Sequence, residues 1–345
     1  MKFIFFIVTV VFFVSCSFQS GDVIGQSDDY SEKVDKSETT DESVDQVDEQ
    51  NEEESDNEVE DTESDEKVIN DEDATQIDTV TIATYNSYRF FDIVCDSGYC
   101  SSSDYEVQFS DSEYQQKVED MAAALKKIDA DIVLIEEVEK KICMEDLLEE
   151  LGSMYSVIYI GETGGTASVD VAVITKGTIV DTDKHLASIP HPDGGTTTFA
   201  RAFLEVEIEL GGKKIIVFAA HFKSKSNDDP DRRLAEAQAA LEIMKDTADE
   251  NPDALIVMGG DLNDFPGSIP IDTLEDSSEL LRVASDISDQ ATYYYDGPIA
   301  IDHLFFALEG SGSYVAGSAQ VVKDSPSWYS LMSSDHAALK ATFEF

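Results

Sequence analysis

The sequence predicts an α+β fold in which two packed sheets carry helices on their outer faces. From Thr79 onward, short runs rich in β-branched and aromatic residues alternate with loops, and these predicted strands fall into two groups. A few segments with helical periodicity lie between the strands. Because each sheet must bury its apolar face against another layer, this order of strands and helices favours a layered sandwich.

The individual elements follow from the spacing of apolar residues. Strands are expected at 79–85, 131–135, 155–160, 169–175, 214–220 and 339–345. Between Tyr114 and Ile128, apolar residues recur every three or four positions, which predicts an amphipathic helix. A second helix is expected from about Asp231 to Ala248.

The N-terminus is typical of a signal peptide. Residues 1–16 hold one lysine, an apolar run from Phe3 to Val14 that is too short to span a membrane, and then Ser15 and Cys16. The end of this segment resembles a bacterial lipoprotein box, so we expect lipidation of Cys16, with an ordinary signal peptide or an uncleaved anchor as alternatives. We expect an exported protein, lipid-anchored in the cell envelope or on the outer surface, and otherwise secreted.

Residues 17–78 form a second distinct segment, with 25 acidic residues against 3 lysines. Such a chain cannot bury enough apolar surface to offset its conformational entropy, so we expect a disordered acidic tether. A cation-binding module is a weaker alternative, because the segment contains no twelve-residue calcium loop with a central glycine. Residues 79–345 are then the folded domain.

The charge of this domain limits its partners. Thr79–Phe345 contains 48 acidic and 19 basic residues, a net charge of −29. Such a field repels nucleic acid at long range and leaves no evident basic patch, so a polyanionic substrate would need a locally bound cation. We expect a monomer that contacts the membrane only through its lipid anchor.

Polar side chains stand at the ends of six predicted strands. They are Asn86, Glu137, His221, Asp261, Asn263, Asp302, Asp335 and His336. In an extended segment, residues i and i+2 point to the same face, so Asp261 and Asn263 should share one polar surface. A structural Asx turn before Pro266 is the alternative for this pair. Carboxylates, imidazoles and carboxamides at so many strand ends favour one site at one edge of the sandwich.

In order, these motifs are an asparagine, a glutamate at the position of a "QE" pair, a histidine, "GDLN" at 260–263, an aspartate and "SDH" at 334–336. The set resembles the endonuclease/exonuclease/phosphatase superfamily, which has the DNase I-like fold, over nearly all of residues 79–345. The resemblance implies a four-layer αββα sandwich of mainly antiparallel sheets that hydrolyses phosphodiesters or phosphomonoesters. The insertion after Asn86 resembles that of exported bacterial members.

The same resemblance implies a divalent metal, usually Mg²⁺, with Mn²⁺ or Ca²⁺ as alternatives. Glu137, Asn86 and Asp335 would hold this ion, which neutralises the phosphoryl oxygens and protects the leaving oxygen. Glu136 stands where the family usually has glutamine. This extra carboxyl either tightens metal binding or faces solvent, and we do not include it in the predicted site.

The resemblance also implies the catalytic groups. Asp261 would orient or deprotonate the attacking water, and Asn263 would donate to the phosphoryl oxygens. His336 would lie against the scissile phosphate, with Asp302 fixing its tautomer and favouring the imidazolium. His221 would be a second imidazole, and the sequence does not divide acid, base and electrostatic roles between the two histidines.

Further polar residues are candidates for the site, and most of them also have a structural alternative. Arg201 aligns with a family arginine that touches the substrate phosphate, although a structural ion pair would explain it equally well. Asp170 aligns with a polar position found in many members. Lys223 and Lys225 either add positive charge near the substrate or are ordinary solvated lysines.

The cysteines agree with export. Cys95 and Cys100 flank a predicted turn, so a small-ring disulfide is plausible, with two free thiols as the alternative. Their spacing, with no histidine or second pair nearby, is poor support for zinc. Cys143 is left unpaired, and we expect it to be buried in a helix after Glu137.

Together these features predict a divalent-metal-dependent phosphoesterase, a nuclease or related phosphodiesterase that acts by metal-assisted attack of water. The same chemistry on a phosphomonoester, a small nucleotide or a phospholipid head group is one alternative. A non-catalytic surface lipoprotein that binds through the sandwich is an alternative of another class. The acidic surface is the main argument against DNA as the substrate.

Overall fold

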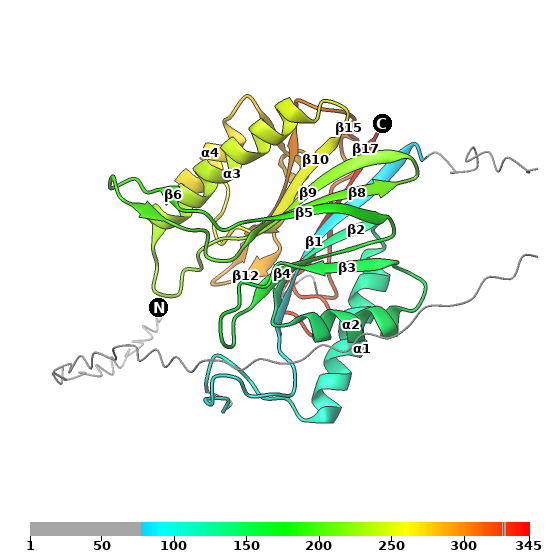
Figure 1. The fold of residues 1–345 in the computed structure, drawn as a ribbon, viewed down its shortest axis with the longest axis vertical. Helices are drawn as coiled ribbons and strands as arrows, with labels where there is room; N and C mark the ends of the chain where they lie inside the picture. The colour runs from blue at the N-terminus through cyan, green and yellow to red at the C-terminus, as the bar shows by residue number, and fades with distance from the viewer. Residues whose placement is uncertain (1–76, 102, 326, 328) are drawn as a thin grey trace, which may run out of the picture. The chain divides into compact units, whose positions relative to one another are not determined.

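The computed structural model describes residues 77–101, 103–325, 327 and 329–345 (Figure 1). The predicted signal peptide, with Cys16, and residues 17–76 of the predicted tether lie outside this range. Of the helices in the described part of the chain, none is both long and apolar enough to cross a membrane.

The first sheet has seven strands in the order β15-β17-β1-β2-β4-β3, with β16 also paired to β17. Its strands are β1 (Thr79–Phe90), β2 (Ile132–Val138), β3 (Val157–Ile160), β4 (Asp170–Thr175), β15 (Ser313–Tyr314), β16 (Gln320–Val322) and β17 (Ala338–Glu344). β1 is parallel to β2 and antiparallel to β17. The last strand therefore returns beside the first.

The second sheet has six strands in the order β11-β14-β10-β9-β8-β5. They are β5 (Thr178–His185), β8 (Phe203–Leu210), β9 (Lys213–His221), β10 (Leu255–Asp261), β11 (Leu280–Arg282) and β14 (Asp302–Ala307). β10 is parallel to β9 and antiparallel to β14. Two small sheets pair β6 (Ile189–Pro190) with β7 (Thr196–Thr197) and β12 (Tyr293–Tyr294) with β13 (Pro298–Ile299).

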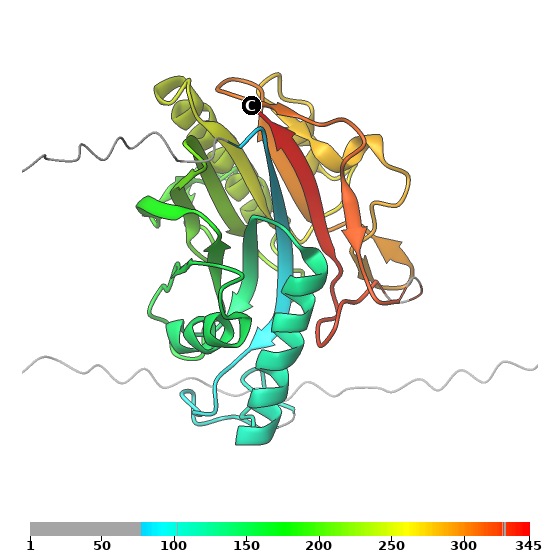
Figure 2. The same cartoon turned by 90° about the vertical axis from the view of Figure 1, so that its right-hand side faces the viewer.

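Helices cover the outer face of each sheet, with α1 (Asp111–Ile128) and α2 (Lys141–Leu151) on one side and α3 (Pro230–Glu250) and α4 (Ile269–Glu275) on the other (Figures 1 and 2). A short 3₁₀ helix, η1 (Val283–Asp286), follows β11. Three apolar clusters fill the spaces between α1/α2 and the first sheet, between the two sheets, and between the second sheet and α3/α4. The layers are therefore αββα.

The predicted four-layer α+β sandwich is confirmed. The predicted helix 114–128 starts three residues earlier, because Ser110 and Glu113 form a capping box at its N-terminus. The first strand runs past its predicted end to Phe90, because its pairing with β2 resumes after a register shift between Asn86 and Phe90. This irregular stretch forms part of the site described next.

Candidate active site

The predicted site residues extend the rows of side chains that fill the space between the sheets. In β9, Val217 and Ala219 face this inter-sheet core, and His221 is the next residue of the same parity. The same holds for three other strands, because the side chains that face the inter-sheet core continue to Asn86 in β1, to Asp261 in β10 and to Asp302 in β14. Strand pairing sets Asp261 directly between His221 and Asp302. The polar site is thus the end of an apolar layer.

Two glycines before Asp261 allow this close packing. A Cβ atom on Gly260 would lie 1.7 Å from the carbonyl oxygen of Ala220 in β9. A Cβ atom on Gly259 would lie 2.5 Å from Leu304 and 2.8 Å from Leu134, which belong to different sheets. Any larger residue here would push the strands or the sheets apart.

A cavity of about 560 Å³ opens at this edge of the sandwich. Seven of the predicted site residues line it: Glu137, Arg201, His221, Asp261, Asn263, Asp335 and His336. Asn86 and Asp302 do not line it; both are buried beside it, at 1 % exposure each. The structure therefore brings the predicted set together at one place.

Asp261 is the centre of this cluster. Its Oδ2 atom accepts a hydrogen bond from Asn86 Nδ2 at 3.1 Å, and His221 Nε2 lies 3.7 Å from the same oxygen. Its Oδ1 atom accepts from the backbone N–H of Asn263 at 2.8 Å. Burial, followed by the neighbouring Asp302, raises the pKa of Asp261, while His336 opposes the rise. A carboxylate with a raised pKa is a suitable acceptor for a proton from water.

Asp261 and Asn263 both line the cavity, but not because they are residues i and i+2 of one extended strand, as the sequence predicts. β10 ends at Asp261, and Asn263 has a left-handed backbone with φ of 54°. The bond from its N–H to the Asp261 carboxylate is an Asx turn, the predicted alternative. Asn263 Nδ2 donates to the carbonyl oxygen of Phe222 and has a second hydrogen to offer. Asn263 can therefore form the Asx turn and still donate a hydrogen bond to a ligand in the cavity.

His336 forms a close charged pair with Asp302. Its Nδ1 atom lies 2.9 Å and 3.2 Å from the two carboxylate oxygens of Asp302, and its ring packs on Tyr293 with centroids 4.7 Å apart. Burial lowers the pKa of His336, but Asp302, Asp261 and Asp335 outweigh burial and raise it to about 10. His336 is therefore an imidazolium at neutral pH.

His221 has the opposite charge state. Burial, with added repulsion from Arg201 and His336, holds its pKa well below the usual value. Its Nδ1 atom is buried and has no hydrogen-bond partner among the described residues. His221 is thus a neutral imidazole beside Asp261, and the two histidines differ in what they can do.

The predicted metal carboxylates offer oxygens that suit a cation. Glu137 lies in a bulge of β2 with φ of 64°, which turns its side chain into the cavity, and its Oε2 atom accepts from Arg89 N at 2.9 Å. Asp335 Oδ1 is buried and has no hydrogen-bond partner within the described residues. Asn86 instead uses its amide group on Asp261 and its Oδ1 atom on Tyr88 N. The orphaned Asp335 oxygen fits a bound divalent cation.

Glu136 faces neither solvent nor the cavity. It is fully buried between the sheets, where its Oε1 atom accepts from Thr84 Oγ1 at 2.7 Å and its Oε2 atom has no described partner. Burial, followed by repulsion from Asp302, raises its pKa well above the usual range. The expectation that this carboxyl could face solvent is wrong, because β2 alternates and Glu136 shares the inter-sheet face of Leu134.

Cations and tyrosines line the cavity together with the carboxylates. Arg201 makes no ion pair with any described carboxylate, so the predicted structural alternative is not observed. Lys225 lines the cavity and binds Asp264 Oδ1 at 2.9 Å. Lys223 points away to carbonyl oxygens of its own loop. The exposed cavity wall also includes Tyr88, Tyr105, Tyr293 and Tyr295.

Two buried contacts that support the site do not follow from the sequence. Lys117 of α1 is 6 % exposed and donates to the carbonyl oxygens of Ser87, Tyr88 and Ser333. It thereby ties the end of β1 to the loop that carries Asp335. A lysine next to the apolar face of a predicted helix is ordinarily expected to reach solvent. The position of Lys117 directly before the apolar Val118 is the one feature of the sequence that weakly indicates its burial.

The second buried contact is the pair of Arg233 and Asp264. Arg233 Nε lies 3.1 Å from Asp264 Oδ2, and both residues are nearly inaccessible. Because Asp264 also binds Lys225, this pair fixes the loop between β9 and α3 at the cavity rim. The arginine lies in a helix far from the strand-end motifs, so no motif points to it.

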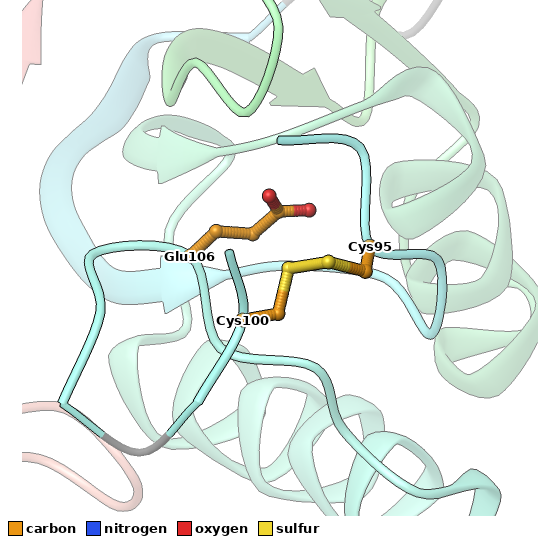
Figure 3. Close-up of side chains that lie close together, drawn as sticks. All are labelled: Cys95, Cys100 and Glu106. Atoms are coloured by element: carbon orange, nitrogen blue, oxygen red, sulfur yellow. A yellow bond between two sulfur atoms is a disulfide. The ribbon is translucent and has the colours of Figure 1, made fainter. Parts of the chain in front are cut away.

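Three predicted features lie outside the cavity. Asp170 accepts hydrogen bonds from Thr163 and Ser168, so it holds the glycine-rich surface loop and not a ligand. Cys95 and Cys100 form a disulfide in the insertion between β1 and α1, beside Glu106 (Figure 3). Cys143 is a buried free thiol in α2.

A four-layer sandwich with carboxylates and two differently charged imidazoles in one edge cavity defines the class of phosphate-ester hydrolases. The chain belongs to the Endonuclease/Exonuclease/phosphatase family, whose sequence pattern matches residues 81–293. Asp302, Asp335 and His336 follow the matched range, and the fold returns them to the same cavity. No curated protein matches the chain significantly.

Solved structures of low sequence identity share this fold. An endonuclease/exonuclease/phosphatase from Bacteroides vulgatus is 16% identical with a TM-score of 0.56, covering 77% of this chain and 99% of its own. Truncated Caenorhabditis elegans TDP2 is 20% identical with a TM-score of 0.52, covering 77% and 98%. D. rerio TDP2 complexed with single strand DNA product is 12% identical with a TM-score of 0.54, covering 77% and 99%.

Proposed function

We propose that this protein is a Mg²⁺-dependent phosphodiesterase that cleaves nucleic acid, and that single strands are its preferred form. One observation carries the proposal: a single cavity contains the carboxylates Glu137, Asp335 and Asp261 and the imidazolium His336. These are the groups that metal-assisted hydrolysis of a phosphate ester requires.

Glu137 and Asp335 would hold the cation, with the amide of Asn86 beside them. When bound, the cation neutralises the phosphoryl oxygens and the charge that develops on the leaving oxygen. Asp261, held by Asn86 and by the Asx turn, accepts a proton from the attacking water. Neutral His221, 3.7 Å from Asp261, is placed to orient that water or relay its proton.

The phosphate itself would be held by positive charge and by hydrogen-bond donors. His336 is fixed as an imidazolium by Asp302, so it can stabilise the phosphoryl oxygens or protonate the leaving oxygen. Among the described residues, the second amide hydrogen of Asn263 has no acceptor, and Arg201 has no carboxylate partner that would neutralise it. This assignment gives the two histidines different roles, which their opposite charge states require.

The substrate class rests on the cavity wall. Tyr88, Tyr105 and Tyr295 are 43%, 48% and 74% exposed around the carboxylates, and exposed aromatic rings beside a few cations are typical of surfaces that stack unpaired bases. The likeness to a TDP2 structure with a single-stranded DNA product supports the same class. The net charge of −29 keeps a small phosphodiester as the second candidate.

Export is part of the proposal. We propose that residues 1–16 direct export, that Cys16 carries the lipid anchor, and that residues 17–78 hold the domain away from the membrane. Labelling cells with radioactive palmitate tests this: label that is present in the natural chain and absent from Cys16→Ser supports the anchor, and equal label rejects it.

The activity test uses supercoiled plasmid, single-stranded DNA, RNA and bis-p-nitrophenyl phosphate, each with Mg²⁺ or with EDTA. Cleavage of single strands that requires metal and is lost in His336→Ala supports the proposal. His185→Ala is the matched control, because His185 also pairs with a carboxylate, Glu205, but does not line the cavity. Turnover of the small diester alone would move the substrate to small esters, and no turnover of any of them would overturn the proposal.

A further inference from the structure

Four carboxylates meet at the base of the insertion between β1 and α1. Asp92, Asp96 and Glu106 belong to the insertion, and Glu139 follows β2 directly. Single oxygens of Asp96, Glu106 and Glu139 all lie within 4.8 Å of one another. Asp92, Glu106 and Glu139 are buried, at 7%, 2% and 3% exposure. Carboxylates are rarely buried together without a compensating cation.

One oxygen of this group has no hydrogen-bond partner. Glu139 Oε2 accepts from the backbone N–H of Asp92 at 2.9 Å, but Glu139 Oε1 is buried and accepts no hydrogen bond from any described residue. The nearest cation, Lys140 Nζ, is 3.9 Å from it, beyond hydrogen-bond distance. The carboxylate is therefore aimed into the cluster with one oxygen unused.

Lys140 compensates the cluster only in part. Its Nζ atom lies 3.0 Å from Asp92 Oδ2 and 2.5 Å from Asp96 Oδ2. One ammonium therefore faces four carboxyl groups. The Lys140 side chain is 32% exposed, so it can swing into solvent when another cation enters.

The donor chemistry favours Ca²⁺ over Mg²⁺. All candidate donors are carboxylate oxygens, the ligands of hard cations. Ca²⁺ accepts six to eight oxygens in an irregular arrangement, including bidentate carboxylates, whereas Mg²⁺ requires a near-ideal octahedron and keeps several of its waters. Several carboxylates from an irregular insertion and a strand end therefore suit Ca²⁺ better.

We propose that Asp92, Asp96, Glu106 and Glu139 form a second cation site, for Ca²⁺, separate from the catalytic cavity. Both oxygens of Glu106 already accept backbone N–H groups of Asp96 and Ser97, so an ion there fixes the turn that the disulfide closes (Figure 3). Such a site clamps the insertion to the end of β2.

The clamp would reach the cavity through Tyr105, which precedes Glu106 and lines the cavity wall. Arg89 donates to the Tyr105 carbonyl oxygen, and its guanidinium lies 5.0 Å from the Tyr105 ring centre. Ca²⁺ therefore holds one wall of the cavity without taking part in the reaction. The binding itself does not depend on the proposed activity.

Calorimetric titration with Ca²⁺ tests the site in the full chain carrying Asp335→Asn and saturated with Mg²⁺, so that the catalytic cavity does not contribute. We expect one Ca²⁺ to bind above the weak background of the acidic N-terminal segment and to raise the midpoint of thermal unfolding. Glu139→Gln should weaken binding by roughly tenfold or more, because it removes one charged ligand. Glu145→Gln, a change at an exposed carboxylate of α2, should leave binding unchanged.

Lys140→Met separates the proposal from a purely structural ion pair. If the ammonium competes with the ion, its removal tightens Ca²⁺ binding. If the Lys140 ammonium alone neutralises these carboxylates in the native protein, Lys140→Met destabilises the protein and Ca²⁺ does not restore the stability. The proposal would be overturned if the parent and Glu139→Gln bound Ca²⁺ with the same affinity, or if Lys140→Met failed to bind Ca²⁺.

Discussion

Replacing Asp302 by asparagine should remove the charge of His336 while keeping its position. Asparagine has the same shape, and its side-chain oxygen can still accept a hydrogen bond from Nδ1. At the observed distance of 2.9 Å, the attraction between carboxylate and imidazolium is roughly 6 kcal/mol at an effective dielectric constant of about 20. This energy corresponds to about four pKa units. We therefore expect the pKa of His336 to fall from about 10 to about 6 or below.

The consequence for activity depends on pH. With a pKa of about 6, only about one His336 in a hundred is charged at pH 8, so turnover should fall about 100-fold there and recover partly as the pH is lowered. The assay is a pH–rate profile alongside an NMR titration of the His336 ring. Asp181→Asn, at an exposed carboxylate of β5, is the control.

Stability gives an independent check on the same pair. The folded pKa of His336 lies above its unfolded value of 6.5, so its contribution, up to about 5 kcal/mol, is fully present below pH 6.5 and is lost as the pH rises toward 10. Asp302→Asn should flatten this loss. If the variant keeps a His336 pKa near 10, Asp261 and Asp335 hold the charge and the reasoning about Asp302 is refuted.

Three further substitutions test buried groups around the site. Glu136→Gln should raise the midpoint of thermal unfolding at neutral pH and change turnover by less than about threefold, because burial and the neighbouring Asp302 raise the pKa of Glu136 and glutamine removes the cost of a buried carboxylate; a large loss of turnover would show that the ionised form is needed. Lys117→Met should cost about 1–3 kcal/mol in chemical denaturation by stranding the Ser87 carbonyl, and Lys126→Met on the exposed face of α1 should cost much less. Arg233→Met should cost up to about 3–5 kcal/mol because it removes the buried partner of Asp264 Oδ2 and leaves only the half-exposed Lys225 at Oδ1; a loss under 1 kcal/mol would argue that Lys225 alone compensates the Asp264 charge.

The fold was predictable from the sequence because apolar periodicity and packing agree in most elements. The helix from Tyr114 and the alternating final strand are examples, since their apolar residues are the buried ones. The place of the site was also predictable, because His221 and Asp261 are polar residues that extend otherwise apolar strands. Such residues need a shared polar surface, and the ends of neighbouring strands supply it.

The remaining details depend on contacts that are distant in sequence. Asn263 joins the site through a left-handed turn, and Glu137 through a bulge, and neither conformation follows from apolar spacing. Lys117 and Arg233 are buried because separate loops close over them, which only the assembled fold determines. The burial of Glu136 follows from strand parity, but this requires knowing which face of β2 meets the second sheet.

The contacts at the catalytic centre also join the two sheets. Asn86 in the first sheet donates to Asp261 in the second, and His336 beside β17 pairs with Asp302 in β14. Neither sheet contains a complete set of reacting groups. A chain split in the turn between β4 and β5 leaves Asn86 and Glu137 on one fragment and Asp261, Asp302 and His336 on the other, while β17 of the second fragment must still pair with β1 of the first. The separate fragments should therefore be inert and regain activity only when they associate, so that turnover becomes a direct signal of fragment complementation.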